Sequence, residues 1–316
     1  MTRMFSAEDV DAALDYGRLI EALRDAFRAP GEKLPVRQSY AVGSDAAPGH
    51  LLCMPAWSRG QAIGTKLVTV FPGNAAKGLG AVSSIYVLFD GETGQPRAII
   101  AGDALTNRRT AAASALAADY LARPDSRTLM VIGNGHVASH LIAAHRAVRP
   151  IDQVLVWGRD PARAEKFAAG MAQAHDLTVR AVADIAEGLA EADIVSCATT
   201  ATTPLVTGAL VRPGTHVDLV GAFTPQMRES DDALIAAASV FVDTWEGALA
   251  EAGDLVQPIA AGTWSADRLK GDLHDLTAGQ VEGRTSPEEI TLFKSVGAAI
   301  EDLVAAQLLT ADPHAA

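Results

Sequence analysis

The stretch that decides the fold is Leu129-Met-Val-Ile-Gly133-Asn-Gly135-His-Val-Ala138. Its apolar start predicts a buried strand, and the pattern G-x-G-x-x-A predicts a tight turn that opens a helix. In such a turn the first glycine permits the bend, the second lets backbone N–H groups approach a diphosphate, and a small third residue lets helix and strand pack closely. A glycine turn between any strand and helix would look similar. A second strand expected at Gln153–Trp157 favours a dinucleotide-binding unit.

Two patterns of secondary structure divide the chain. A helix over Ser6–Phe27, with Ser6 as its N-cap, precedes short strand-like segments separated by Gly, Pro and Asn, which predict a β-rich unit. After an alanine-rich helix at 110–122, strands alternate with helices, which predicts parallel βαβ units. We therefore expect an α/β protein: a Rossmann-type doubly wound parallel sheet at 109–287 and a smaller β-rich domain at 1–108. A last helix, 287–309, is expected to return to the β-rich domain as part of 288–316.

The expected elements are as follows. The strands of the first unit are 36–42, 51–54, 63–70, 83–89 and 97–101. The strands of the second unit are 128–132, 153–157, 179–182, 194–196, 216–220 and 240–242. The helices of the second unit are 137–147, 161–174, 184–190 and 231–237.

Composition excludes several classes of protein. The chain has 316 residues, 49% of them hydrophobic and 20% charged, which is typical of a folded protein with sizeable cores. A net charge of −12 argues against binding to nucleic acid or to a membrane surface, and an anionic substrate would need a local group of Arg and Lys. The two cysteines, Cys53 and Cys197, indicate buried thiols in a reducing compartment, and the histidines show no metal-ligand spacing. Without a signal core or membrane-length apolar run, we expect a cytoplasmic protein without a metal.

Several motifs together resemble the ornithine cyclodeaminase/mu-crystallin family. They are Gly64-Thr-Lys66-Leu-Val, Leu105-Thr-Asn-Arg-Arg109-Thr110-Ala-Ala-Ala-Ser, the glycine turn, Val220-Gly-Ala-Phe-Thr-Pro225-Gln-Met-Arg-Glu229 and Glu289-Ile-Thr-Leu-Phe-Lys294-Ser-Val-Gly297. The resemblance implies a homodimer built through the β-rich domain, a substrate cleft between the domains, and chemistry on amino acids or their imines with a nicotinamide cofactor.

The family holds several activities, and two departures discriminate among them. Ornithine cyclodeaminases carry an Asp in a Gly-x-Asp-x-Pro loop, whereas this chain has Phe223 at that position. They also carry a Glu just before a Met-Pro pair, whereas Leu-Cys precedes Met54-Pro55 here. Both departures remove carboxylates expected to handle amino groups. The Phe223 loop instead resembles that of bacterial pyrroline-2-carboxylate reductases.

Three basic residues are the candidates for substrate binding. Arg109 can clamp a carboxylate through two parallel hydrogen bonds, although a surface Arg paired with a nearby acid such as Asp103 would look the same. Lys66 lies between apolar neighbours of a strand and could orient a ligand or move a proton, or it could simply guard a strand edge. Arg37 matches a substrate-side arginine of the family, and Phe223 is placed beside the substrate. Lys66 and Arg109 are the predicted catalytic residues.

The residue after the second strand of the dinucleotide unit decides the expected cofactor. NAD-binding units usually place an acid there, whereas this strand ends in Trp-Gly-Arg159-Asp160-Pro161. Arg159 can pair with a 2′-phosphate, so NADPH is favoured and NADH is expected to bind more weakly, while Asp160 also fits a helix N-cap. The predicted cofactor-binding residues are Thr110, Gly133, Asn134, Gly135, His136, Val137, Arg159, Arg163, Thr199, Thr200, Val220 and Lys294.

These features predict an NADPH-dependent reductase of a cyclic ketimine carboxylate, with pyrroline-2-carboxylate and piperideine-2-carboxylate as alternative ring sizes. An ornithine cyclodeaminase, an alanine dehydrogenase and a crystallin-like protein that binds NADPH without turnover remain as alternatives. The expected partners are this small imine and a second copy of the chain.

Overall fold

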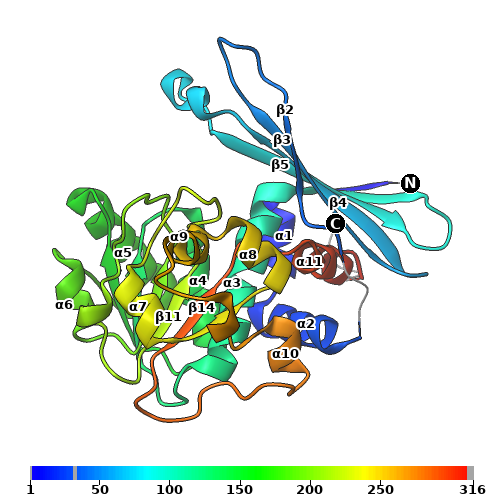
Figure 1. The fold of residues 1–316 in the computed structure, drawn as a ribbon. Helices are drawn as coiled ribbons and strands as arrows, with labels where there is room; N and C mark the ends of the chain where they lie inside the picture. The colour runs from blue at the N-terminus through cyan, green and yellow to red at the C-terminus, as the bar shows by residue number, and fades with distance from the viewer. Residues whose placement is uncertain (1, 31–33, 312–316) are drawn as a thin grey trace. The chain divides into compact units, whose positions relative to one another are not determined.

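The chain folds into two compact units in a computed structural model that describes residues 2–30 and 34–311 (Figure 1). Unit 1 comprises Met1–Ala26, Pro30–Arg109 and Ala298–Ala316, and unit 2 comprises Phe27–Ala29 and Thr110–Gly297. The boundary between the units within α3 falls between Arg109 and Thr110, whereas the expected boundary was 108/109. The returning C-terminal segment starts at Ala298, ten residues after 288.

Unit 1 is built on a six-stranded sheet in the order β1-β6-β5-β4-β3-β2. β1 runs parallel to β6, and all other neighbours are antiparallel. Helix α11 packs against β3, β4 and β5, and α1 packs against β6. The elements are β1 (Arg3–Phe5), α1 (Ala7–Ala13), α2 (Tyr16–Arg28), β2 (Gln38–Ala41), β3 (His50–Ser58), β4 (Ala62–Val70), the 3-10 helix η1 (Pro72–Lys77), β5 (Val82–Asp90), β6 (Pro96–Ala101) and α11 (Ala299–Ala311).

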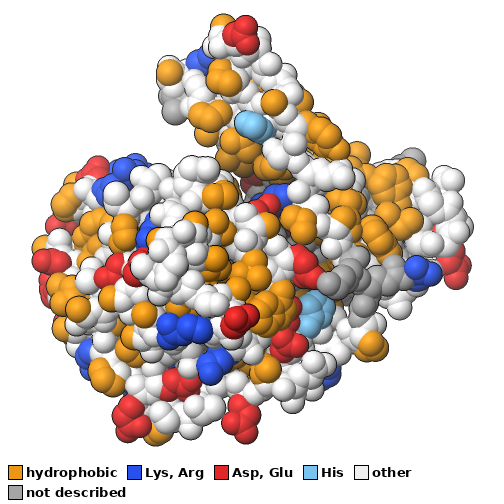
Figure 2. Space-filling model, viewed as in Figure 1, with side chains coloured by type: hydrophobic (Ala, Val, Ile, Leu, Met, Phe, Trp, Pro, Cys, Tyr) orange, Lys and Arg blue, Asp and Glu red, His pale blue; other side chains and the backbone are white. Residues whose placement is uncertain are grey.

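The strands of this sheet sort their side chains between two faces, because successive residues of a strand point to opposite sides. In β4, Lys66 and Val68 are 2% and 8% exposed on the face that α11 covers. On the opposite face Ile63 is 42% exposed and Ile85 of β5 is 46% exposed. Figure 2 shows hydrophobic side chains gathered over this sheet. One face of the sheet is therefore a core, and the other is apolar and partly open.

Unit 2 is a doubly wound sheet of eight parallel strands in the order β13-β12-β14-β11-β10-β7-β8-β9. Alternating residues of β7 enter two separate cores. Leu129 and Val131 pack with alanines of α3, α4 and α5, whereas Met130 and Ile132 pack with residues of α6, α7 and α9. Helices therefore cover both faces, and the predicted fold class is confirmed.

The elements of unit 2, with α3 beginning in unit 1, follow in chain order. The strands are β7 (Thr128–Ile132), β8 (Gln153–Trp157), β9 (Thr178–Ala181), β10 (Ile194–Cys197), β11 (His216–Leu219), β12 (Ser239–Val242), β13 (Gly271–Asp272) and β14 (Thr291–Lys294). The helices are α3 (Gly102–Leu121), α4 (His136–Val148), α5 (Pro161–His175), α6 (Ile185–Leu189), η2 (Gly208–Leu210), α7 (Asp232–Ala237), α8 (Trp245–Glu251), α9 (Gly253–Ala261), η3 (Ala266–Arg268) and α10 (Leu273–Thr277). In the described part of the chain, no helix combines the length and apolar character needed to cross a membrane.

The helix predicted over 287–309 is wrong in its first half. Residues 291–294 form β14, which lies between β11 and β12 in the sheet, and α11 starts only at Ala299. Gly297 has φ +88°, a left-handed conformation that separates strand from helix. A short, fully buried strand carries no alternation of polar and apolar residues, so periodicity cannot distinguish it from a buried helix.

The first helix is also divided where a single one was expected. The predicted cap is present, since Ser6 and Asp9 form a reciprocal capping box at the start of α1. The side chain of Asp15 then accepts a hydrogen bond from the N–H of Arg18 at 3.1 Å. Such a bond to an acidic side chain starts a new helix, and α1 and α2 are therefore distinct.

Candidate functional site

The glycine turn of unit 2 lies where the strand order of the sheet reverses direction along the chain. Gly133 follows β7 with φ +114°, a conformation that favours glycine. A Cβ added there would come within 2.6 Å of the carbonyl oxygen of Ala198, which follows the neighbouring strand β10. A glycine is therefore needed at position 133, both for this backbone conformation and for the close approach of Ala198. Ligands of doubly wound folds bind at this kind of position.

The turn leaves the N-terminus of α4 open for an anion. Its N-cap is Gly135, which offers no side chain to satisfy the first N–H groups of the helix, including those of His136 and Val137. A Cβ added at Gly135 would meet no atom within 4 Å, so the space before the helix is open. Free N–H groups and a positive dipole end fit the diphosphate of a dinucleotide.

The residues predicted to select the cofactor lie beside this turn. The backbone of Gly158 lies under the side chain of Asn134, since a Cβ on Gly158 would be 2.9 Å from Asn134 Nδ2. The next residue, Arg159, is exposed, and so is Arg163 one turn into α5. Asp160 accepts the N–H of Arg163 at 3.2 Å as the N-cap of α5, which is the alternative role weighed for it. These placements leave Arg159 available for a 2′-phosphate.

The part of α3 that belongs to unit 2 begins at Thr110, on the side of the same edge of the sheet. Near its other end, the carbonyl oxygen of Leu121 accepts a hydrogen bond from Thr291, the first residue of β14, at 2.8 Å. Midway, Ser114 donates to Asp218 of β11 at 3.1 Å. Thr110 is one turn before Ser114, so α3 runs against the strand direction and brings Thr110 to the side of their carboxyl ends.

A buried carboxylate joins the loops that follow β10 and β11. Glu229 accepts hydrogen bonds from the N–H and hydroxyl of Thr199 at 2.7 and 2.8 Å, and from the N–H groups of Gly221 and Ala222 at 2.7 and 3.2 Å. Burial raises the pKa of Glu229, although Lys294 opposes this. Four donors from two loops on one side chain fix the loops that contain Thr199, Thr200 and Val220.

Lys294 belongs to this support and is not open to a ligand. Its side chain is fully buried, and its Nζ donates to the carbonyl oxygen of Leu219 at 3.1 Å. Asp254 lies 3.4 Å from the same Nζ and Glu229 lies 4.0 Å away. The predicted direct contact of Lys294 with a cofactor would require displacement of these partners. Lys294 has these buried partners because it belongs to β14, a buried strand that was not predicted.

Phe223 sits at the tip of the loop that Glu229 anchors. Its side chain is 39% exposed, and its N–H donates to the carbonyl oxygen of Gly221 at 2.8 Å. No carboxylate occupies this position, as the sequence already indicated. The loop therefore presents an aromatic ring where the cyclodeaminase pattern has an acid.

In unit 1 the two predicted catalytic residues meet on one carboxylate. Lys66, on β4, places its Nζ 3.0 Å from Oδ1 and 2.8 Å from Oδ2 of Asp302 on α11. Arg109, near the middle of α3, donates from Nε to the same Oδ1 at 3.1 Å. Its Nη1 donates to Glu301 at 2.6 Å. The four side chains are all buried, with exposed fractions of 5% or less.

Burial and pairing set the charges of this cluster. Burial, followed by the charge of Arg109, lowers the pKa of Lys66, while Asp302 raises it, and the net value is about 8. Burial alone would raise the pKa of Asp302, but Arg109 and Lys66 hold it below its usual range. Asp302 and Glu301 outweigh burial to raise the pKa of Arg109. Of Lys66, Arg109 and Asp302, only Lys66 therefore has a pKa near neutral pH.

The structure brings the predicted substrate-binding residues of unit 1 together and adds two acids that were not predicted. Lys66 and Arg109 lie together, as expected. Arg37 precedes β2 and is half-buried, and its charge lowers the pKa of Lys66 slightly, so it belongs to the same neighbourhood. Glu301 and Asp302 were not predicted. Two adjacent acids inside the otherwise apolar segment Ala298-Ala-Ile-Glu-Asp-Leu-Val-Ala-Ala were the available signal.

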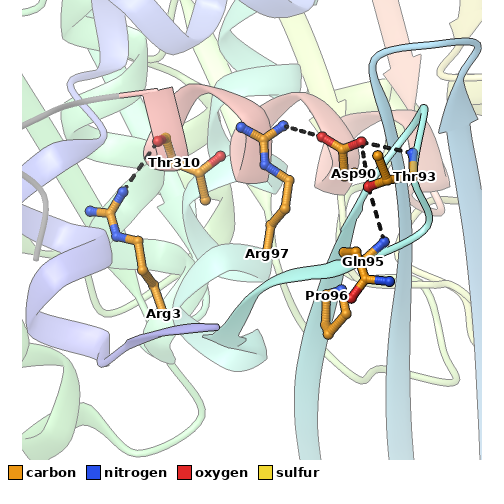
Figure 3. A pocket seen from close by; sticks show the side chains of 7 residues that line it. All are labelled: Arg3, Asp90, Thr93, Gln95, Pro96, Arg97 and Thr310. Carbon is orange, nitrogen blue, oxygen red and sulfur yellow. Dashed lines mark hydrogen bonds and ion pairs between the residues drawn. The ribbon is translucent and has the colours of Figure 1, made fainter. Parts of the chain in front are cut away.

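A polar hollow elsewhere on unit 1 has no such chemistry. Figure 3 shows this hollow of about 330 Å³, with Arg3, Arg97 and Asp90 among its lining side chains. Its arginines are engaged locally: Arg97 lies 4.0 Å from Asp90, and Arg3 donates to the carbonyl oxygen of Thr310 at 3.3 Å. None of the predicted site residues lines it. We assign the candidate site to the Lys66 cluster and the glycine turn.

Comparisons with known proteins identify the family of the chain. The model of the ornithine cyclodeaminase/mu-crystallin family matches residues 1–312. The Delta(1)-pyrroline-2-carboxylate reductase of Paracoccus denitrificans is 42% identical over 308 residues, which cover 97% of this chain and 96% of that protein. Among solved structures, the fold is similar to Delta(1)-pyrroline-2-carboxylate reductase of Thermococcus litoralis in complex with NADH and L-proline, with a TM-score of 0.92, 35% identity, and coverage of 98% and 97% of the two chains. An archaeal alanine dehydrogenase dimer with bound NAD has a TM-score of 0.89 at 29% identity, with coverage of 98% and 95%.

Proposed function

Because the chain belongs to the ornithine cyclodeaminase/mu-crystallin family, we propose that it reduces cyclic ketimine carboxylates with a nicotinamide cofactor. The substrates would be pyrroline-2-carboxylate and piperideine-2-carboxylate, and the products proline and pipecolate. The similarity over nearly the whole length to reductases of pyrroline-2-carboxylate supports this substrate class. The observation that carries the proposal is the buried pair of Lys66 and Arg109, held side by side by Asp302.

Each of the two cations has a distinct part in this reaction. Arg109 uses Nε and Nη1 on Asp302 and Glu301, and among the described residues its Nη2 has no hydrogen-bond partner. Nη2 is therefore the donor that remains for a substrate carboxylate. Lys66, as an ammonium, protonates the imine nitrogen, directly or through one water. A protonated imine is a far better acceptor of hydride at its carbon, and Lys66 then regains its proton from solvent.

The charges of the cluster refine the expected positive pocket. Lys66 and Arg109 carry two positive charges, and Glu301 and Asp302 carry two negative charges, so these four side chains are together neutral. Arg37 contributes a further positive charge that acts on Lys66. We propose that Arg37 binds the substrate carboxylate with Arg109, while the acids keep the two buried cations from repelling each other.

Unit 2 supplies the cofactor site. The open N-terminus of α4 after Gly133 and Gly135 would hold the diphosphate, and the loops fixed by Glu229 would border the nicotinamide ribose. When bound, the nicotinamide supplies the hydride. We propose NADPH as the preferred form because Arg159 is exposed beside the turn and no acid precedes it. The similar structures contain NADH or NAD, so this preference is a property of the present chain that needs its own test.

The rival activities fit the site less well. Phe223 and the Leu-Cys pair before Met54 replace the carboxylates of ornithine cyclodeaminases, so no base is present at either position to accept a proton from an amino group. Alanine dehydrogenase is favoured by one observation, the similarity to the archaeal enzyme. An exposed aromatic ring at Phe223 suits an apolar ring substrate better than a short open-chain one. The buried Lys66–Asp302–Arg109 arrangement argues for turnover and against a crystallin-like binding protein.

The apolar face of the unit 1 sheet supports a homodimer. Met4, Ile63 and Ile85 are 68%, 42% and 46% exposed on this side, and cross-strand neighbours such as Leu67 and Ile99 are half-buried. Exposed apolar patches of this kind mark interfaces between proteins. We propose that two chains pack these faces together, as sheets do in sandwiches.

A substrate panel tests the proposal directly. NADPH consumption by the purified chain would be followed with five- and six-membered cyclic imine carboxylates, with pyruvate plus ammonia or methylamine, and with no acceptor. Ornithine with NAD would be assayed for proline and ammonia. We expect the highest kcat/KM with a cyclic imine. Highest activity with pyruvate and ammonia would identify an alanine dehydrogenase, and no activity with any acceptor would favour a binding protein.

A further inference from the structure

Among the described residues, Asp302 is the only side chain that bonds to both Lys66 and Arg109. It lies in the first turn of α11. Its Oδ1 accepts hydrogen bonds from both Lys66 and Arg109, and its Oδ2 lies 2.8 Å from Lys66 Nζ. Within the described residues it is the only carboxylate bonded to Lys66. Its exposed fraction is 0%, so no water competes freely for these contacts. The spacing between the ammonium and the guanidinium is therefore set by one carboxylate group.

Glu301, the neighbour of Asp302 on the helix, makes a different set of contacts. Its Oε2 accepts from Nη1 of Arg109 at 2.6 Å, and its Oε1 accepts from the N–H of Ala298 at 3.2 Å. It supports the same guanidinium but does not bond to Lys66. Substitutions of the two acids can therefore be compared directly, because both acids pair with Arg109 and only Asp302 bonds to Lys66.

The groups that face Lys66 come from every element around it. Asp302 lies on α11, Arg109 on α3, and Arg37 on the segment before β2. Tyr86 is its cross-strand partner on β5, and Met54 is its partner on β3. The Tyr86 hydroxyl is fully buried, and its pKa is raised by burial and then by Asp302, so it stays neutral. The charges of Arg109 and Arg37 therefore lower the pKa of Lys66, and the charge of Asp302 raises it.

We propose that Asp302 is a positioning residue that holds Lys66 beside Arg109 and keeps it protonated for transfer to the substrate. This inference rests on the proposed reduction of a cyclic imine. Without the charge of Asp302, Lys66 would face Arg109 and Arg37 alone in a buried place. An ammonium in that setting loses its proton, and a neutral amine cannot protonate an imine. Asp302 itself does not touch the substrate or exchange a proton.

The direction of the pH effect follows from this arrangement. Lys66 has a pKa of about 8, so its ammonium form predominates at neutral pH and is lost as the pH rises through 8. Asp302→Asn removes the one charge that raises this pKa. The alkaline limb of kcat/KM should then move to lower pH by roughly one to three units, the range for an opposite charge within contact distance. Ionisation of the imine itself is the same for every variant, so it cancels in the comparison.

The experiment compares the native chain with Asp302→Asn, Asp302→Glu and Glu301→Gln. For each, kcat and kcat/KM with pyrroline-2-carboxylate are measured against pH. The pKa of Lys66 is measured separately by NMR of carbon-labelled lysine, with its signal assigned by loss in Lys66→Arg. We expect Asp302→Asn to shift both the limb and the NMR pKa downward. Glu301→Gln should raise KM and leave both in place. Asp302→Glu should keep the limb but lower kcat, because the longer side chain moves the carboxylate.

Each outcome decides the matter. A uniform loss of kcat/KM at all pH values in Asp302→Asn, with an unchanged Lys66 pKa, would show that Asp302 only packs α11 against the sheet. An equal shift in Glu301→Gln would show a general charge effect and overturn the assignment to Asp302. If Asp302→Asn does not fold, native kcat in Asp302→Glu would overturn the positioning role. If the native chain reduces no imine, the proposed function fails, while the NMR titration still tests the link between Asp302 and Lys66.

Discussion

At the scale of the residue, the site depends on buried charges that are paired. Lys66 and Arg109 are tolerated inside unit 1 because Asp302 and Glu301 lie within hydrogen-bonding distance. Removal of one partner of such a group leaves an uncompensated charge and costs about 3–5 kcal/mol. Substitutions in the cluster therefore need a stability measurement beside every rate measurement.

Arg109→Lys tests the carboxylate-binding role of the guanidinium. Lysine keeps the charge but loses the planar set of donors that reaches Asp302, Glu301 and a ligand together. We expect kcat/KM to fall by roughly 10- to 100-fold, since a hydrogen bond to a charged group contributes about 1.5–3 kcal/mol. Cofactor affinity, measured by fluorescence titration, should not change. Near-native turnover in a variant with native thermal stability would show that Arg109 is only structural.

Arg159→Ala tests the selection of the cofactor. The exposed side chain has little to stabilise in the fold, so the effect should be confined to binding. We expect NADPH to bind more weakly by about 1.5–3 kcal/mol and NADH to bind as before, because only NADPH carries the 2′-phosphate. Calorimetric titration with both cofactors measures this. Equal losses for the two would contradict a phosphate contact.

The sequence predicted the site residues that belong to a recognisable motif. Lys66 and Arg109 were predicted together, and the structure brings them within reach of one carboxylate. The partners of Glu301 and Asp302 could not be predicted, because they are separated from the two acids by nearly two hundred residues or more. Lys294 was predicted at the cofactor, but it lies under the loops as their support. Only tertiary packing shows which buried charges meet.

At the scale of the element, the turn between β7 and α4 is held by backbone geometry. Gly133→Ala would place a Cβ 2.6 Å from the Ala198 carbonyl oxygen in a left-handed conformation, so both the turn and its contact with β10 must shift. We expect a loss of stability of about 1–3 kcal/mol even without cofactor, measured by denaturant unfolding. Gly135→Ala is the matched control, because it has a negative φ and open space around it.

The two glycine variants should differ in kind. Gly135→Ala should unfold like the native chain but bind the cofactor more weakly, since the new methyl group points into the space for the diphosphate. If Gly135→Ala bound NADPH normally, the diphosphate would not approach the helix N-terminus as proposed. If Gly133→Ala were as stable as the native chain, the turn would be more adaptable than its geometry indicates.

Elements with a clear period or cap were predictable, and short buried ones were not. The strands β7 and β8 have the predicted bounds, and Ser6 caps α1 as expected. β14 was taken for helix because its four residues are all buried and carry no alternation. The helices between Trp245 and Thr277 were not identified. The loops fixed by Glu229 also needed the structure, because their hydrogen bonds depend on a residue that the motif contained without a known role.

At the scale of the whole molecule, the open sheet face predicts the assembly. Ile85→Asp would place a charge within the apolar face, and burial of an unpaired carboxylate costs several kcal/mol. We expect a dimer for the native chain and a dissociation constant roughly a thousand-fold or more higher for the variant, seen by light scattering after size exclusion. Leu79→Asp is the control, because Leu79 is an exposed apolar residue after η1 and outside the sheet, at 61% against 46% for Ile85. A native chain that is monomeric at all concentrations would contradict the proposed interface.

In the proposed reaction, the chain transfers hydride from the nicotinamide to the carbon of a cyclic imine. The most direct measurement uses NADPH deuterated at the transferring position of the nicotinamide, pyrroline-2-carboxylate as substrate, and mass spectrometry with NMR of the product. We expect proline with a single deuterium on the carbon that bears the carboxylate, and no proline from ornithine with NAD. Proline formed from ornithine, or an imine left unreduced while another acceptor gains the deuterium, would contradict it.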